Sequence, residues 1–568
     1  EPDLVKTDGQ RIVALAKGTL HLVDATGDAP ELRGSLPVSA SANAQVFLAG
    51  ERVFLLDNVS VWGYGWDEWG EPSPGLPDLQ QWFDDETWQV ARIAEIDVSN
   101  PDDMKVVANL YVAADYISAR AIGETSRIVL RSRPNGLTFK SPYDVIAEWQ
   151  GEGQGEEDVG NGGVDPVLPS QGDPGVDGEP AVGDAPADGV SFRGGNPWED
   201  LWDEAVETAK AHNDQVIDES GPDNWLPKYV YEDLSGGEPV ITEGLLVDCD
   251  DAMYPGSFSG HNLLSVMTLD LASKLSLGHV VGIFSEGETV YSSRENLYVA
   301  THPWWSEFGN QVEELTSYVH KFELTDSESS KYVASGQVPG YLLSQWSMSE
   351  FNDDLRVAST DQDGWDTDSS HSLVTVLRQE GNELKQVGQV DGLGQGEEIY
   401  AVRFMGERGY IITFRQIDPL YTLDLADPTS PEVKGELKLN GCPAYLHPVG
   451  QDLLLGVGRD GDSDGNIMGT QLSLFDVADA SNPVRLHATE LGSEWGSSEV
   501  EFDHKAFLYW QPNQLAVVPV SSYSFEEGIE SSFKGALGYQ IDAETGFTLV
   551  GDVEHESGND DPYWYGGG

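Results

Sequence analysis

Cysteine is scarce in this 568-residue chain. The two cysteines, Cys249 and Cys442, belong to no Cys-x-x-Cys pair and no His/Cys cluster, which argues against a structural zinc site. In an exported protein these two residues form one long-range disulfide. In the alternative interpretation they are two buried free thiols.

Positive charge is also scarce. Lys and Arg number 31 against 98 Asp and Glu, which gives a formal net charge of −67. Such a charge repels nucleic acid and anionic membrane surfaces, so neither is an expected partner. The acidic excess has two interpretations: a solvated, salt-adapted surface, or a surface that binds several Ca²⁺ ions through carboxylate oxygens.

Long hydrophobic runs are missing as well. No stretch of 18 apolar residues occurs, so we expect no membrane span. The first residues already resemble a strand rather than a signal peptide, so we expect any leader to be removed or to lie outside this sequence. With 39% hydrophobic residues and 16 Trp, the chain as a whole has enough apolar surface to fold.

A strand–turn–strand unit recurs eight times along the chain. Seven copies carry an acidic residue near the turn, and the fifth copy, ending near Leu377, does not. The seven acidic residues are Asp24, Asp97, Asp270, Glu323, Asp424, Asp476 and Asp542. Asp424 and Asp476 are 52 residues apart, and Asp270 and Glu323 are 53 apart. A period of this length with four short strands per unit is typical of a β-propeller.

The sequence therefore predicts an all-β chain, a single β-propeller domain over 1–568 with eight four-stranded blades. Seven blades remain possible if one terminal unit is only partial. We label the strands of a blade A to D, from the axis outward. The long insertions fall between strands B and C, which places them on one face of a propeller. They cover 61–88, 142–260, 301–314, 361–370, 459–469 and 521–533.

The longest insertion has two parts. Residues 151–195 are rich in Gly, Pro, Asp and Glu, which predicts a disordered acidic segment. Residues 196–219 predict an amphipathic helix that starts at Asn196 and Pro197. Six apolar residues follow at helical spacing: Trp198, Leu201, Trp202, Ala205, Ala209 and Val216. We expect this apolar face to pack against the propeller rim; the alternative is a free helix for a partner.

Several strings resemble the secreted β-propeller domain family that is distantly related to WD-repeat proteins. They include Arg403-Phe-Met-Gly406, Tyr410-Ile-Ile-Thr-Phe-Arg415, Tyr445-Leu-His-Pro448, Leu472-Ser-Leu-Phe-Asp-Val477 and Asp503-His-Lys-Ala-Phe507. The resemblance covers nearly the whole chain outside 151–195. It implies an exported bacterial or archaeal protein, and it implies no particular chemistry because members of the family are mostly uncharacterised.

Two acidic loops are candidate calcium sites. Asp460, Asp462, Asp464 and Asn466 alternate around glycines, as in loops that wrap one Ca²⁺ ion. Position twelve of this loop is Gln471 instead of the usual bidentate Glu, so other groups or water would complete the shell. Asp361 and Asp363 form a weaker version. The alternative is that both are acidic, solvated turns.

The inner strands carry an unusual set of polar residues. They are Arg120, Ser292, Arg403, His447, Asp503 and His504. We expect them near the start of strand A, at the mouth of the axial channel. There they either line a ligand pocket or a His-containing metal site, or satisfy buried backbone groups and lock adjacent blades.

Tryptophans gather in two of the insertions. They are Trp62, Trp66, Trp69, Trp82 and Trp88 in one, and Trp304 and Trp305 in the other. Aromatic rings beside carboxylates suit sugar faces or cationic groups, protein interfaces, or a small core that folds the loop onto the rim.

We therefore expect an exported acidic β-propeller, secreted or on the cell surface, that acts as a binding or structural module and is stabilised by calcium. The face with the B–C insertions would contact another protein or further copies of the chain, and a glycan is a further candidate. The alternative is a hydrolase or lyase acting on glycans or peptides at the channel mouth.

Overall fold

The computed structural model describes residues 1–27, 29–61, 76–84, 87–151, 197–301, 315–324, 327–363, 366–414, 418–461, 467–493, 495–526 and 529–555. These residues form two compact units. Of the described residues, those within 1–135, 222–301 and 315–555 belong to the β unit, and those within 136–151 and 197–221 belong to the helical unit.

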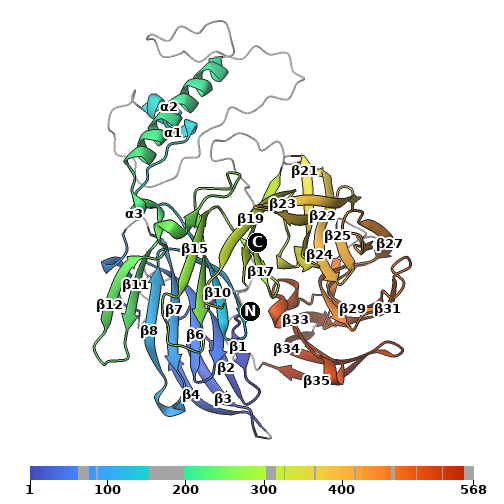
Figure 1. Ribbon diagram of the computed structural model, residues 1–568. Helices are drawn as coiled ribbons and strands as arrows, with labels where there is room; N and C mark the ends of the chain where they lie inside the picture. The colour runs from blue at the N-terminus through green and yellow to red at the C-terminus, as the bar shows by residue number, and fades with distance from the viewer. Residues whose placement is uncertain are drawn as a thin grey trace. The chain divides into compact units, whose positions relative to one another are not determined.

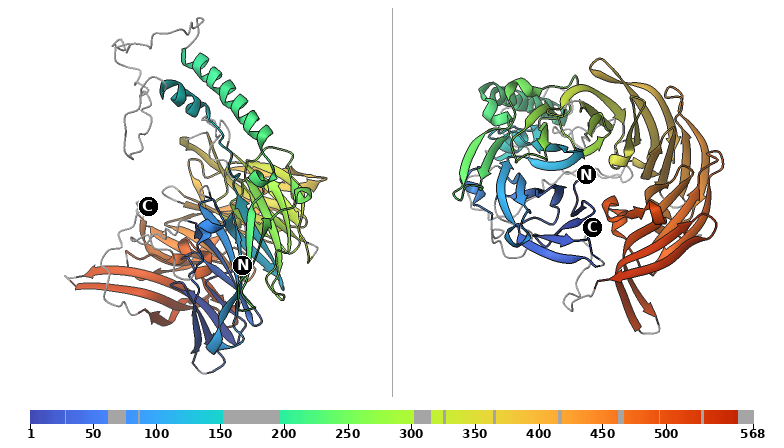
Figure 2. Two further views of the ribbon diagram at one scale, coloured as in Figure 1. Left: turned by 90° about the vertical axis from the view of Figure 1, so that its left-hand side faces the viewer. Right: turned by 60° about the horizontal axis from the view of Figure 1, so that its bottom comes forward.

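The described residues of the β unit form eight four-stranded blades that follow one another around a common axis (Figures 1 and 2). Blades 1 to 4 are β1(Val5–Thr7), β2(Arg11–Ala16), β3(Thr19–Asp24), β4(Glu31–Pro37); β5(Gln45–Ala49), β6(Arg52–Ser60), β7(Gln89–Asp97), β8(Lys105–Val112); β9(Asp115–Ile122), β10(Thr125–Ser132), β14(Leu263–Asp270), β15(His279–Phe284); and β16(Thr289–Ser292), β17(Asn296–Ala300), β18(Thr316–Glu323), β19(Lys331–Pro339).

Blades 5 to 8 are β20(Met348–Phe351), β21(Asp354–Asp363), β22(Asp366–Glu380), β23(Glu383–Leu393); β24(Glu398–Met405), β25(Arg408–Phe414), β26(Asp418–Asp424), β27(Glu432–Leu439); β28(Cys442–Val449), β29(Leu453–Gly461), β30(Ile467–Asp476), β31(Val484–Leu491); and β32(Leu508–Trp510), β33(Leu515–Glu526), β34(Ile529–Asp542), β35(Gly546–Glu554). The predicted β-propeller with eight blades is confirmed.

The repeated aspartate has a structural role. At the end of strand C, one carboxylate oxygen accepts a hydrogen bond from the backbone N–H two residues later, 2.9 Å away in Asp97 and Asp476 and 3.0 Å in Asp424. This Asx-turn starts the C–D connection. A β-bulge follows in the same hairpin, for example between Thr422 and Leu423. The recurring acidic residue therefore shapes the turn.

The long B–C insertion of blade 3 also contributes strands. β11(Lys228–Asp233) pairs antiparallel with β8 and β12(Val240–Leu245) pairs with β11, so both strands extend blade 2 at its outer edge. β13(Ala252–Met253) pairs parallel with β15. The assignment of β11 and β12 to blade 2 could not be made from the sequence, because the sequence of a strand does not show which distant strand it pairs with.

Apolar side chains fill the spaces between successive blades. Seven buried clusters join blades 1–2, 2–3, 3–4, 4–5, 5–6, 6–7 and 7–8. The sheets of blades 2 to 7 thus bury both faces, as a strand that is apolar on both sides requires. These clusters fix each blade relative to the next, and with the blades the loops that connect their strands.

The helical unit contains α1(Pro142–Gly151) and α2(Pro197–Glu219). The predicted helix over 196–219 is thereby confirmed. Its apolar face packs on α1, where Ala205 and Ala209 are buried together with Val145 and Ile146. The sequence predicts that this face packs on the propeller rim. Instead it packs on α1, a helix that the sequence did not predict. Residues 152–196, which include most of the segment predicted as disordered, lie outside the described residues.

A short helix, α3(Pro222–Trp225), leads back into the β unit. Within the described ranges, none of the helices combines the length and the apolar character that crossing a bilayer requires.

Candidate functional site

Three of the predicted channel residues occupy equivalent positions on strand A of three blades. Arg120 lies on β9, Arg403 on β24 and His447 on β28, each two residues before the last paired residue of its A–B hairpin. The prediction that they lie near the start of strand A is therefore wrong. The register is set by the A–B turn, and it places them nearer the opposite end of the strand from the B–C insertions.

Arg120 joins a polar network that crosses blades. Its Nη2 donates to the carbonyl oxygen of Val290 at 2.8 Å and also lies 3.2 Å from a carboxylate oxygen of Glu1. Arg120 also donates to the side-chain oxygen of Gln345. His504 Nε2 lies 3.0 Å from the second Glu1 oxygen and 3.1 Å from Gln345 Nε2. Chain segments from blades 1, 3, 4, 5 and 8 meet here.

The acid in this network is held in its charged form. Burial by itself raises the pKa of Glu1. The hydrogen bond from His504 and the positive charge of Arg120 lower it by more than this, so the resulting pKa is about 2. The Glu1 carboxylate is therefore ionised throughout the neutral range and pairs with Arg120. Burial also lowers the pKa of Arg120, which Glu1 partly opposes.

Arg403 continues the network through aromatic rings. Its guanidinium carbon lies 3.7 Å from the ring centre of Trp346 and 5.3 Å from that of Tyr445. Its Nε donates to the carbonyl oxygen of Leu446 at 2.7 Å. The ion pairs found among the described residues give Arg403 no carboxylate partner, so cation–π contacts and a backbone carbonyl compensate its buried charge.

His447 completes the network as a neutral group. Its Nδ1 lies 3.2 Å from the hydroxyl oxygen of Tyr445, and its ring contacts Phe507 and Tyr509 at 5.0 and 5.2 Å between centroids. Burial lowers the pKa of His447 to about 4, with a further contribution from Arg403. An uncharged imidazole among aromatic rings is packed as part of a blade-to-blade contact.

Two predicted channel residues are peripheral: Asp503 reaches the network only through His504, whose Nδ1 lies 3.9 Å from its carboxylate, and Ser292 lies outside it. Asp503 accepts the backbone N–H of Lys505 at 2.9 Å and is more than half exposed. Ser292 donates to the carbonyl oxygen of Ser293 at 2.8 Å, within its own hairpin. The sequence reasoning missed Glu1, Gln345, Trp346 and Tyr445. Tyr445 could have been found, because it lies two residues before His447 and so on the same face of the strand.

The axial network is thus a set of polar groups that contact one another, although Arg403 Nη2 is buried without a hydrogen-bond partner among the described residues. Arg120, Glu1, Gln345 and His504 exchange contacts, and Arg403 stacks between rings. Burial raises the pKa of Tyr445, so its hydroxyl stays protonated and is no base at neutral pH. The contacts favour the interpretation in which these residues lock adjacent blades together.

The predicted calcium loops are only partly described. Asp462, Asp464 and Asn466 lie outside the described residues, and Asp460 accepts the side-chain N–H of Gln471 at 2.6 Å. Asp361 and Asp363 lie on β21. In the described part of the chain, no group of three or more His, Cys, Asp and Glu residues is arranged to hold a metal ion. Calcium binding stays a prediction.

The predicted tryptophans divide into two groups. Trp82 contacts the Tyr111 ring at 5.6 Å and belongs with Phe83 to a small core under the B–C connection of blade 2. Trp88 is 73% exposed. The others lie outside the described residues: Trp62, Trp66, Trp69, Trp304 and Trp305. Trp82 thus follows the small-core interpretation, and Trp88 does not.

The predicted disulfide is wrong. Cys249 and Cys442 are both free thiols. Cys442 is buried on β28 of blade 7, whereas Cys249 is exposed in the B–C insertion of blade 3, which also departs from the alternative of two buried thiols. Blades 3 and 7 are not neighbours in the ring, so the fold does not bring the two thiols together.

Exposed aromatic rings concentrate on one side of the blades. In an antiparallel blade, the B–C and D–A connections leave from the same end of the strands. Five of the seven exposed aromatic side chains in the described residues of the β unit lie in these connections: Trp88, Tyr254, Phe258, Trp495 and Phe502. Tyr523 lies on β33 near its B–C end, and Trp510 alone lies at an A–B connection.

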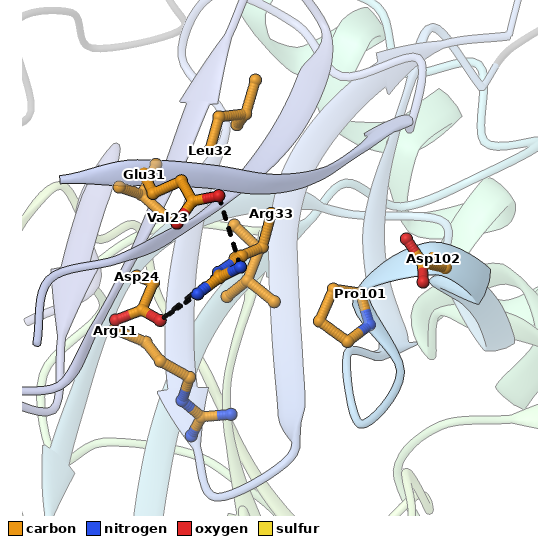
Figure 3. A pocket seen from close by; sticks show the side chains of 9 residues that line it. Arg11, Val23, Asp24, Glu31, Leu32, Arg33, Pro101 and Asp102 are labelled. Carbon is orange, nitrogen blue, oxygen red and sulfur yellow. Dashed lines mark hydrogen bonds and ion pairs between the residues drawn. The ribbon is translucent and has the colours of Figure 1, made fainter. Parts of the chain in front are cut away.

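A cavity of about 500 Å³ on the other end of blade 1 shows a contrasting surface (Figure 3). Arg33 lies 2.9 Å from Asp24 and 3.3 Å from Glu31, and Arg11 and Pro101 complete the lining. Arg33 is paired with two acids of the lining and Arg11 with Asp8, and these pairs are partly exposed, so the two arginines offer little net attraction to a ligand.

Comparison with known proteins agrees with this architecture. The model of a family described as β-propeller domain matches residues 1–566. An uncharacterised protein of Methanocaldococcus jannaschii is 36% identical over 231 residues, which is 40% of this chain and 35% of that protein. An uncharacterised protein of Archaeoglobus fulgidus is 33% identical over 275 residues, 47% of this chain and 41% of that protein. The matches thus span well under half the length of these relatives.

Proposed function

Because the chain belongs to the β-propeller domain family, we propose that it is a binding module that engages a partner protein, or further copies of itself, through the face formed by its B–C and D–A connections. An exported location and stabilisation by calcium are part of the proposal. Its support is the net charge of −67 and the acidic loop that starts at Asp460.

The distribution of exposed aromatic rings carries the proposal. Trp88 is 73% exposed, Trp495 76% and Phe502 85%, and they come from connections of blades 2, 7 and 8. Trp, Tyr and Phe are enriched at protein interfaces, where they anchor the contact. Large apolar side chains left in water on one face of a folded scaffold are typical of such an interface.

The axial network supports a scaffold more than a catalyst. Its Arg, Glu and His groups contact one another, and the neutral His447 lies against a tyrosine hydroxyl that stays protonated. A hydrolase or lyase at the axis needs a base that reaches a substrate. We therefore propose that the B–C and D–A connections bind the partner, and that the axial network keeps the blades that carry these connections in place.

Site-specific photo-crosslinking tests the proposal. A photoreactive phenylalanine analogue replaces Trp88 or Phe502 in two variants and Trp510, at an A–B connection, in a control variant. We expect crosslinked adducts from positions 88 and 502 and none from 510. The purified chain alone tests self-association, and cells that make the protein test other partners. Adducts from position 510 equal to those from 88 and 502, or none at any position, would contradict the proposal.

Calcium is tested separately by thermal unfolding. We expect a higher melting temperature in millimolar CaCl₂ than in EDTA, because a cation that binds only the folded state stabilises it. The variant Asp460→Asn/Asp462→Asn/Asp464→Asn removes the acidic ligands and should abolish this increase. An identical melting temperature of the wild type in both buffers removes calcium from the proposal.

A further inference from the structure

The strongest unassigned site lies between blades 4 and 5. Their outer strands, β19 and β23, pair in parallel over two residue pairs, Ser335 with Glu383 and Gly336 with Leu384. No other D strands of consecutive blades in the described ranges pair with each other. Beyond this short ladder the two strands separate, and a groove of about 810 Å³ opens between them.

Neutral hydrogen-bonding side chains dominate this groove, which we call the blade 4–5 groove. They are Ser257, Thr316, Tyr318, Ser335, Gln337, Asn382 and Gln386. Its lysine, Lys385, lies 2.9 Å from Glu380 and 3.6 Å from Glu383, so its charge is already compensated. The Gln337 and Asn382 amides are exposed, and neither makes a side-chain hydrogen bond to the described residues. The carboxylates of Asp361 and Glu383 also line the groove and repel anions. Since the rest of the lining is mostly neutral and hydrogen-bonding, an uncharged ligand rich in hydroxyl groups fits it.

The wall of the groove is rigid. Ser335 Oγ lies 2.6 Å from His320 Nδ1 and 2.7 Å from the Tyr332 hydroxyl, and His320 Nε2 lies 2.8 Å from Ser285 Oγ. His320 is completely buried, and burial lowers its pKa to about 4, so it adds no positive charge. Blade 1 has the same cross-strand pair, His21 with Ser35 at 2.8 Å, which indicates a structural device of the blade. Side chains fixed in this way bind with a smaller entropy cost.

Two exposed rings neighbour groove residues in the sequence. Gly256 and Ser257 line it, and Tyr254 and Phe258 flank them in the sequence. Tyr254 is 76% exposed and stacks on Phe284 at 4.6 Å with 16° between the planes, which fixes one face of its ring and leaves the other to solvent. A solvent-exposed aromatic face two residues from the groove lining suits the apolar face of a sugar ring, whose hydroxyl rim the amide and hydroxyl groups of the groove would bind.

An extended peptide fits less well. A peptide that adds to β19 as a further strand needs a row of free backbone N–H groups along the edge. β19 ends in Pro339, which has no N–H, and at Gly336 the edge already faces the carbonyl oxygen of Leu384. The geometry therefore favours recognition through side chains.

We propose that the blade 4–5 groove binds a neutral oligosaccharide. This ligand goes beyond the partner protein of the loop face, and it involves amide groups that the proposed function does not use. The two proposals can fail separately.

Direct titration with neutral hexasaccharides of glucose, mannose and N-acetylglucosamine tests the inference, using isothermal calorimetry and the full chain. We expect saturable binding of at least one of them. The variant Gln337→Ala/Asn382→Ala should weaken this binding by about tenfold, because two hydrogen bonds are lost, and Tyr254→Ala should weaken it by a similar factor.

The matched control is Gln540→Ala, which removes an exposed strand amide on β34, outside the groove. It should leave both the affinity and the melting temperature unchanged. Equal melting temperatures of all variants show that the fold is intact. The inference is overturned by the absence of saturable binding, or by binding that Gln337→Ala/Asn382→Ala and Gln540→Ala affect equally.

Discussion

The interface between blades 6 and 7 differs sharply from the junction between blades 8 and 1. At the first, Ala401, Ile412 and Leu420 of blade 6 pack on Leu446 and Phe475 of blade 7, all buried. None of the buried apolar clusters of the described residues joins blades 8 and 1. There the polar link is between Glu1, which leads into blade 1, and His504, which leads into blade 8.

The facing surfaces at this junction are apolar but exposed. Val5 and Leu32 of blade 1 are 51% and 60% exposed, and Leu508, Trp510 and Val553 of blade 8 are 53%, 54% and 67% exposed. The pairing of their strands shows on which face they lie. In blade 1 these residues lie on the face opposite to the one that packs on blade 2, and in blade 8 on the face opposite to the one that packs on blade 7. An apolar sheet face is thus buried between blades 6 and 7 and exposed to solvent at the junction of blades 8 and 1.

One glycine position shows the difference most clearly. Gly435 of blade 6 and Gly551 of blade 8 have the same place in strand D, opposite the residue before the β-bulge. A Cβ at Gly435 would lie 2.4 Å from the carbonyl oxygen of Ala480, in the C–D connection of blade 7. A Cβ at Gly551 meets nothing within 4 Å. Glycine is therefore needed where the next blade packs closely.

The largest expected effect comes from Gly435→Val. The new side chain collides with backbone of blade 7, which cannot move without opening the interface, so we expect a loss of at least about 3 kcal/mol in the free energy of unfolding. Guanidinium-induced unfolding measures it. Gly551→Val is the matched control and should change stability by no more than about 0.5 kcal/mol. Equal losses in both variants would show that the junction of blades 8 and 1 is packed as closely as the others.

A similar contrast is expected for apolar side chains. Leu446→Ser removes a buried side chain from the 6–7 interface and should cost about 3 kcal/mol. Leu508→Ser on the exposed face of blade 8 should cost less than about 0.5 kcal/mol. Unfolding curves of the two variants under one condition make the comparison. A large loss in Leu508→Ser contradicts it.

Glu1→Gln tests the polar link. The pKa of Glu1 is lowered from 4.5 to about 2 in the folded protein, where burial is outweighed by His504 and Arg120. A group with a lowered pKa stabilises the fold above its ordinary pKa, and this contribution is lost as the pH falls through the folded value. We expect the wild type to lose on the order of 2 kcal/mol from this group between about pH 5 and pH 2, and the variant not to show this loss.

The control for this prediction is Glu544→Gln, an exposed carboxylate without an ion pair among the described residues. It should keep the pH dependence of the wild type. A Glu1→Gln variant with the wild-type pH profile would mean that Glu1 does not hold the two blades.

The smallest expected effect is at the turn beside the packed interface. Asp476 accepts the backbone N–H of Ala478 at 2.9 Å and so shapes the connection that carries Ala480 onto Gly435. Asp476→Ala should cost about 1 kcal/mol, and Asp476→Asn, which keeps an acceptor oxygen, only a few tenths. Thermal unfolding separates the two; an equal effect would assign the role of Asp476 to its charge.

Much of the fold was readable from local patterns. Alternating apolar residues, Asp at the turn and a period near 52 residues predicted the strands and their number of blades, because those signals act within one hairpin. The helix of 196–219 was also readable from its spacing. The network at the axis was only half predicted: Arg120, Arg403, His447 and His504 were found, but Glu1, Gln345 and Trp346 come from segments whose proximity depends on the ring.

By itself, the sequence determined the blades, the acidic surface and the connections that carry insertions, since each depends on composition or on neighbours along the chain. The tertiary structure alone decided which polar residues meet at the axis, that β11 and β12 join blade 2, that the two thiols stay apart, and that β19 and β23 open a groove. These features arise from packing between segments far apart in the chain, where no local pattern records the partner.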